Sequence, residues 1–207
     1  INGRPNDNIG ITLFAGETFT QCPLTVDHAV LLDMIHNIKC GLITDGTAVG
    51  MGIANAVTRL KDSKAKSKVI ILLTDGTNNK GDISPMTAAE IAKSFGIRVY
   101  TIGVGTNGMA PYPYPVGNTV QYVSMPVEID EKTLTEIAGT TDGNYFRATS
   151  NSKLKEVYEE IDKLEKTKLN VKEYSKRDEE YHLFALAAFL CVLLEVLLRN
   201  SVLKKIP

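Results

Sequence analysis

Residues 69–74 form an unbroken run of apolar and β-branched residues that is followed at once by Asp75 and Gly76. A run of this kind predicts a strand buried on both faces, as in a parallel sheet that helices cover. In open α/β sheets, ligand sites lie just beyond the carboxyl ends of the strands. Asp75 occupies such a position, so we expect it to belong to the functional site.

Strand and helix patterns alternate on both sides of this run. Two short strands, at 8–15 and 18–21, are close enough in sequence to pair as an antiparallel hairpin. Thr25 is expected to cap the first helix and Gly139 to end the fourth. Further strands are predicted at 97–104 and 144–148, and helices at 26–38, 48–60, 84–95, 130–138 and 150–166. This order predicts an α/β fold with a mainly parallel, doubly wound sheet.

The segment from Thr106 to Ser124 departs from this alternation. Its Met-Ala-Pro-Tyr-Pro-Tyr-Pro sequence at 109–115 excludes a helix or a central strand. Residues 120–123 are expected to form one arm of a hairpin excursion. Tyr112, Tyr114 and Tyr122 suit either an exposed contact patch or packing of the excursion onto the domain, and the sequence leaves both open.

Composition excludes several classes of function. The net charge of -1 gives no basic patch for nucleic acid, which we do not expect as a partner. Cys22, Cys40 and Cys191 are widely spaced, so neither a zinc site nor a disulfide framework is predicted. No Walker loop, HExxH or Gly-x-Ser-x-Gly sequence is present, and the protein is not expected to be an enzyme.

The carboxyl-terminal part differs in kind from the rest. Residues 168–180 read as a charged linker, and residues 183–194 carry no polar side chain apart from one thiol. At about 1.5 Å per residue the apolar run alone is shorter than a bilayer core of about 30 Å. Including Tyr181 at one edge and Leu203 at the other makes a span feasible. We therefore predict a domain at 1–167, a linker at 168–180 and a transmembrane helix at 181–203.

Three polar clusters lie where loops meet the predicted strand ends. They are Thr44-Asp45-Gly46-Thr47, residues 74–78, and the weaker Gly103-Val104-Gly105-Thr106. Carboxylate and hydroxyl oxygens without histidine or cysteine suit a hard cation, Mg²⁺ first and Mn²⁺ or Ca²⁺ next. Thr47 and Asp75 are the leading candidate ligands, with Asp45 as a further one.

The sequences around Thr47 and Asp75 resemble the von Willebrand factor A family. In its metal-ion-dependent adhesion site, a threonine loop and an aspartate after the fourth strand complete an Asp-x-Ser-x-Ser motif. Thr47 matches the threonine and Asp75 the aspartate. The resemblance implies that Thr47 binds the cation directly, that Asp75 acts through coordinated water, and that a partner's carboxylate fills an open position.

No Asp-x-Ser-x-Ser precedes Ile9 in this chain. We therefore expect an amino-terminally truncated fragment that lacks the first strand of the family. In the sheet, that central strand would lie between the strands at 9–15 and 69–74. In this interpretation the cation is bound by the full-length protein.

A narrower resemblance is to membrane-anchored, aerotolerance-type Bat proteins of bacteria. It rests on the opening Ile1-Asn2-Gly3-Arg4, on residues 13–16 and 46–52, on the Pro/Tyr-rich excursion and on the terminal apolar segment. The resemblance implies a BatA-like interaction module in a complex associated with a MoxR-type ATPase. It also implies an inner-membrane location with the domain on the periplasmic side.

Two other functions remain open from the residues alone. Asp75 suits an α/β enzyme in which it is a phosphoacceptor or a metal-bound catalytic carboxylate, although the strand ending at Gly103 offers no lysine to accompany it. Alternatively, the chain is a structural subunit with a vestigial metal site, and its terminal helices mediate assembly.

Overall fold

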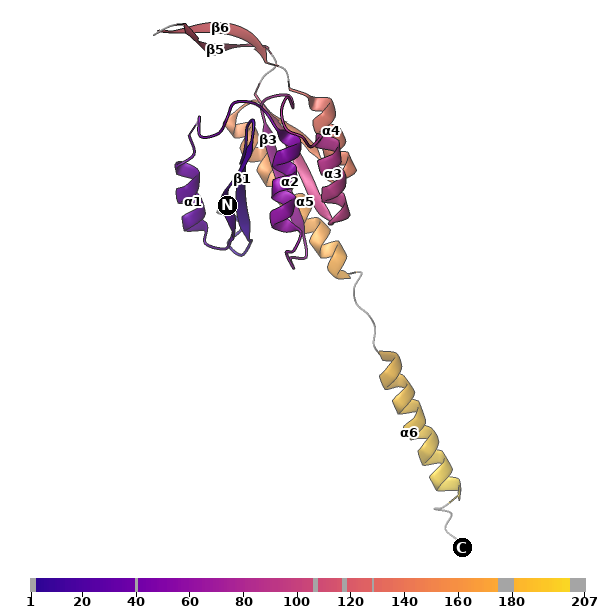
Figure 1. Ribbon diagram of the computed structural model, residues 1–207. Helices are drawn as coiled ribbons and strands as arrows, with labels where there is room; N and C mark the ends of the chain where they lie inside the picture. The colour runs from indigo at the N-terminus through magenta and orange to yellow at the C-terminus, as the bar shows by residue number, and fades with distance from the viewer. Residues whose placement is uncertain are drawn as a thin grey trace. The chain divides into compact units, whose positions relative to one another are not determined.

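Three parallel strands form the central sheet of the protein. A computed structural model describes residues 3–39, 41–105, 108–116, 119–127, 129–174 and 181–201. The sheet has the order β3 (Lys68–Thr74), β4 (Ile97–Val104), β7 (Tyr145–Ala148), and both neighbouring pairs are parallel. In Figure 1, helices lie around these strands. The predicted α/β fold with a parallel sheet is confirmed.

Helices cover both faces of this sheet. On one face, α2 (Val49–Leu60), α3 (Pro85–Ser94) and α4 (Glu131–Thr140) enclose a core that includes Ile70, Leu72 and Val99. On the other face, α5 (Asn151–Tyr174) packs Val157 and Ile161 against Tyr100 and Ile102. Successive residues of β3 and β4 alternate between the two faces, which is why both strands are almost continuously apolar.

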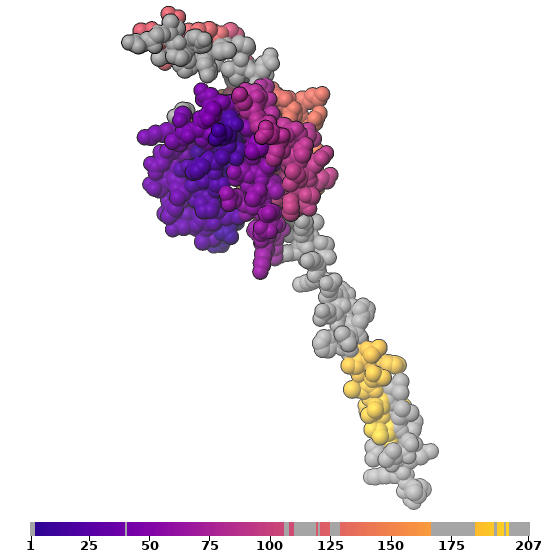
Figure 2. All heavy atoms as spheres, viewed as in Figure 1, coloured from indigo at the N-terminus to yellow at the C-terminus, as the bar shows by residue number. Residues whose placement is uncertain are grey.

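The first two strands form a separate antiparallel hairpin. It comprises β1 (Ile9–Phe14) and β2 (Thr18–Thr25), and within the described residues it pairs with no strand of the central sheet. Helix α2 contacts β1, β2 and β3, and so links the hairpin to the sheet. Figure 2 shows the side chains of these segments, indigo to magenta, forming one continuous surface.

Two predicted helix boundaries are wrong. Thr25 ends β2 instead of capping the first helix; the cap of α1 (His28–His36) is Asp27, whose carboxylate accepts from the N–H groups of Ala29 and Val30. Gly139 lies inside α4, which continues to Thr140. Burial of Leu134, Ile137 and Ala138 holds that helix in place, and packing therefore outweighs the low helix propensity of a single glycine.

The proline-rich excursion forms a hairpin of its own. Strands β5 (Gly108–Val116) and β6 (Thr119–Val127) pair antiparallel along their whole length, as a two-stranded sheet. The predicted hairpin is therefore confirmed, and its proline-bearing arm is a strand. Thr106 and Glu128 lie outside the described residues.

The chain divides into two compact units, Ile1–Glu165 and Lys166–Pro207. Helix α5 extends to Tyr174, so the first half of the expected linker is helical, and α6 spans Tyr181–Ser201. Among the residues with a described structure, no helix is both long and apolar enough to cross a membrane. The predicted transmembrane helix at 181–203 is thus not supported; Glu195 and Arg199 interrupt its apolar sequence.

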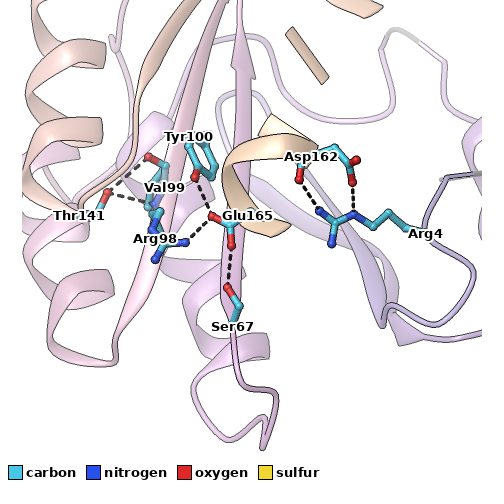
Figure 3. A network of polar contacts seen from close by, with 8 residues as sticks. All are labelled: Arg4, Ser67, Arg98, Val99, Tyr100, Thr141, Asp162 and Glu165. Carbon is cyan, nitrogen blue, oxygen red and sulfur yellow. Dashed lines mark hydrogen bonds and ion pairs between the residues drawn. The ribbon is translucent and has the colours of Figure 1, made fainter. Parts of the chain in front are cut away.

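A buried carboxylate holds α5 against the amino ends of β3 and β4. Glu165 is 4% exposed and accepts hydrogen bonds from Ser67, at 2.8 Å, and from the hydroxyl of Tyr100, at 2.6 Å. It also forms an ion pair with Arg98 (Figure 3). Burial alone would raise the pKa of Glu165, but these three donors outweigh it and lower the pKa below the ordinary value. The charged form is therefore the native one.

Candidate functional site

Two loops meet at the carboxyl end of β3, on the edge of the sheet opposite Glu165. One loop, residues 43–48, precedes α2, and the other, residues 75–84, connects β3 to α3. The N–H of Thr47 donates to Oδ1 of Asn79 at 2.9 Å, and the carbonyl of Thr47 accepts from the N–H of Asn79 at 3.0 Å and of Lys80 at 3.2 Å. These bonds fix the backbone of Thr47 between the two loops.

The side chain of Thr47 lies against the start of the second loop. Its hydroxyl oxygen would be 3.3 Å from a Cβ atom added to Gly76, the residue that follows Asp75. Gly76 in turn is held by Thr74, whose hydroxyl accepts from the N–H of Gly76 at 3.3 Å and donates to its carbonyl at 3.2 Å. The structure therefore brings Thr47 beside the segment that carries Asp75, as the sequence predicts.

Thr47 does not cap α2. The residue in the capping position is Ala48, which provides no side-chain hydrogen bond, and the N–H of Val49 instead donates to Oδ1 of Asn78 at 2.8 Å. An amide from the other loop thus satisfies one of the free N–H groups at this helix start. The Thr47 hydroxyl is therefore not used to cap this helix.

Close backbone contacts fix the first loop from its other side. The N–H of Gly16 donates to the carbonyl of Thr44 at 2.7 Å, and the N–H of Ala48 donates to that of Ala15 at 2.7 Å. A Cβ atom on Gly16 would stand 2.8 Å from the carbonyl oxygen of Asp45. The turn of the β1–β2 hairpin therefore packs against the loop that contains Thr47 and fixes its backbone.

The three predicted site residues differ in position. Asp75 and Asp45 are exposed, and Thr47 is half-buried. No described bond joins the Asp45 carboxylate to the other two residues, so only Thr47 and the Asp75 segment are brought together. Sequence reasoning missed Asn78 and Asn79 as the residues that hold the loops. The one available signal was the pair of amides directly after Asp75-Gly76-Thr77, since such side chains often bond to neighbouring backbone.

The donor atoms suit a hard cation, but they are few. Hydroxyl and carboxylate oxygens are the ligands that Mg²⁺ and Ca²⁺ prefer. Across the described ranges, no group of three His, Cys, Asp or Glu side chains lies close enough together to hold a metal ion. Thr47 and Asp75 therefore fit part of a coordination shell, the remainder of which needs water or other ligands.

A parallel α/β sheet with polar loops at the carboxyl ends of its strands defines a class of binding domains in which function resides in those loops. The sequence profile of the von Willebrand factor type A domain matches residues 1–160. The chain belongs to this family.

Solved structures and a curated relative agree with this assignment. The protein BatB of Bacteroides thetaiotaomicron is 34% identical, with a TM-score of 0.66 over 78% of this chain and 80% of its own. An aerotolerance-related membrane protein of Bacteroides fragilis is 31% identical, with a TM-score of 0.64 over 76% and 80%. A protein of Borreliella burgdorferi is 26% identical over 100% of this chain, which spans 61% of that relative's length.

One relative has been solved with metal in the corresponding family motif. Proximal thread matrix protein 1 of the mussel byssus, described with a zinc-occupied MIDAS motif, is 26% identical, with a TM-score of 0.57 over 77% of this chain and 36% of its own. The similarity to an aerotolerance-related protein and to a protein with a zinc-occupied MIDAS motif is thus independent of the site geometry described above.

Proposed function

We propose that the chain is a non-enzymatic protein-interaction module, and that its binding site is formed by the loops 43–48 and 75–80. The observation that carries this proposal is the position of the Thr47 hydroxyl, 3.3 Å from where a Cβ atom on Gly76 would stand, between two loops joined by four hydrogen bonds. Because these bonds order the backbone before any ligand arrives, little conformational entropy is lost on binding.

A divalent cation completes the proposed site. Thr47 supplies a hydroxyl oxygen, and Asp75 supplies a carboxylate that acts directly or through water. Mg²⁺ is held in many sites by one or two carboxylates and keeps several waters, which suits so sparse a set of protein ligands. A carboxylate from the bound partner takes an exchangeable position, so that the metal and the partner bind cooperatively.

Association with a membrane forms part of the same proposal. It is supported by the name of the Bacteroides fragilis relative, and by the exposed apolar side chains of α6 (Leu186, Phe189, Leu190, Val192, Leu194, Val196 and Leu198). Exposed apolar surface of this kind is typical of membrane or protein contact. The periplasmic location and the association with a MoxR-type ATPase remain predictions from the family resemblance.

Metal titration of the full-length protein that contains this chain tests the site. Mn²⁺ binding, followed by the loss of the free-ion paramagnetic resonance signal, is expected to weaken at least tenfold in Asp75→Asn and in Thr47→Val. The matched control is Asp62→Asn, another exposed aspartate in a loop, which should bind Mn²⁺ as the natural chain does. Equal Mn²⁺ affinity in all four proteins would exclude the proposed cation site.

A further inference from the structure

The β5–β6 hairpin presents an uncharged surface. No Asp, Glu, Lys or Arg occurs between residues 99 and 127, a range that includes both strands. Met109, Tyr122 and Val123 are 66%, 71% and 47% exposed. Within the described residues, β5 and β6 pair only with each other. An isolated two-stranded ribbon is marginally stable in water, so pairing with a further strand would stabilise it.

Prolines close the outer edge of β5. Pro111, Pro113 and Pro115 oppose Ser124, Tyr122 and Val120. In an antiparallel ladder, alternate residues point their N–H and C=O groups toward the partner strand or away from it. A proline has no N–H to give to the ladder, so all three belong to the outward-pointing set. The outer edge of β5 consequently lacks the donors that a further strand would need.

In the part of the chain that the structure describes, no strand pairs with the outer edge of β6. Since opposed residues share the same orientation in an antiparallel pair, Val120, Tyr122 and Ser124 point their backbone N–H and C=O groups away from β5. Pro126, which opposes Met109, ends this row of donors. The hairpin thus has one edge that accepts a strand and one that does not.

We propose that the open edge of β6 pairs with β6 of a second copy of this chain. An antiparallel arrangement about a twofold axis at Tyr122 sets Tyr122 opposite the partner's Tyr122. It also sets Val120 opposite the partner's Ser124, and Ser124 opposite the partner's Val120. All three pairs are of the hydrogen-bonded type, which gives about six backbone hydrogen bonds, two for each pair. Pro126 falls outside the paired segment.

Two features favour a second copy as the occupant. The row of donors is self-complementary about its central residue, which is the condition for a twofold interface. The absence of charge also removes the like-charge repulsion that keeps most exposed edges apart. The resulting sheet has the order β5–β6–β6–β5, with proline edges on both outer sides, and the assembly therefore stops at two copies and does not continue as a fibre.

Site-specific crosslinking of the full chain tests the register. In a background with Cys40→Ser and Cys191→Ser, Tyr122→Cys places two thiols on directly opposed residues. Their Cα atoms are then about 5.5 Å apart, within the range of a disulfide. Val123→Cys, one residue away, has no such partner because its thiols lie diagonally across the axis. We expect mild oxidation to crosslink Tyr122→Cys at least tenfold faster than Val123→Cys.

A backbone variant tests the edge itself. When added to Tyr122→Cys, Ser124→Pro removes one outward N–H without removing a bond to β5, and should reduce the crosslinking rate at least tenfold. Ser124→Ala, which keeps the N–H, should leave the rate unchanged. Because the readout is a disulfide between the β6 strands of two copies, association through α6 does not imitate it. Equal rates for Tyr122→Cys and Val123→Cys, or for Ser124→Pro and Ser124→Ala, would overturn the proposal.

Discussion

The hydroxyl of Tyr100 donates to Oε1 of Glu165 across 2.6 Å, inside the interface between β4 and α5. Burial, followed by the bond to Glu165, raises the pKa of Tyr100 above its ordinary range. The phenol therefore stays protonated and remains a donor. A helix that is otherwise rich in surface charge thus places one ionised side chain, Glu165, in the core.

Replacing this group should destabilise the protein. Glu165→Gln removes the charge that Arg98 neutralises and weakens the bonds from Tyr100 and Ser67. We expect a loss of about 2–4 kcal/mol in the free energy of unfolding, since one member of a buried ion pair is left without its partner. Urea denaturation measures this. Glu156→Gln, which breaks only an exposed pair with Lys153, should change stability by less than about 0.5 kcal/mol.

The same carboxylate should make stability fall on acidification. The pKa of Glu165 is lower in the folded state than the ordinary value of 4.5. Its ionised form therefore contributes stability above the unfolded pKa, and this contribution is lost as the pH falls through the folded pKa. The difference in unfolding free energy between the natural chain and Glu165→Gln should narrow steadily below about pH 4.5. A difference that stays constant from pH 7 to pH 3 would contradict this assignment.

Two glycines in helices should respond oppositely to alanine. A Cβ atom on Gly50, near the start of α2, would lie 2.0 Å from the carbonyl oxygen of Ile83. Gly50→Ala must push this backbone away, and we expect a loss of about 1–3 kcal/mol. A Cβ atom on Gly139 in α4 meets nothing within 4 Å. Gly139→Ala should therefore stabilise the protein by about 0.5–1 kcal/mol. Thermal unfolding of both variants measures these changes. Equal shifts in the unfolding temperature would contradict the close approach of Gly50 to the carbonyl of Ile83.

Asn78 should stabilise α2 through its side-chain oxygen. Asn78→Ala leaves the N–H of Val49 without its acceptor, and we expect a loss of about 1 kcal/mol. Asn78→Asp keeps an oxygen and adds a negative charge at the amino end of a helix, so its stability should stay within about 0.5 kcal/mol of the natural chain. Chemical denaturation compares the two. If both variants lose the same amount, the cap is not formed as described.

The central sheet was predictable because its strands have strong local signals. Residues 69–74 and 97–104 are long apolar runs followed by glycine-containing turns, and the structure has strands at Lys68–Thr74 and Ile97–Val104. The end of β2 was not predictable in this way. A threonine such as Thr25 suits a strand end and a helix cap equally well. In the structure Thr25 ends β2, and Asp27, two residues later, caps the helix.

The adjacency of Thr47 and the Asp75 segment was implied by the family resemblance, in which both belong to one metal site. Strand order alone gives only the position of Asp75, because loop 43–48 lies between α1 and α2. The residues that hold the two loops together could not be predicted from the sequence. Asn78 and Asn79 bond to backbone 29 and 32 residues away, and no local pattern encodes such a choice of partner. The burial of Glu165 could not be predicted for a similar reason. In the sequence it resembles the exposed charged residues of the same helix, and its partners Arg98 and Tyr100 are far away along the chain.

The cap supplied by Asn78 also constrains the order in which the chain folds. Helix α2 precedes Asn78 in the sequence, with all of β3 between them. On a nascent chain, the N–H of Val49 therefore gains this acceptor only after a residue synthesised later has appeared. Loop 43–48 likewise gains its hydrogen bonds to Asn79 and Lys80 only after β3 has been synthesised.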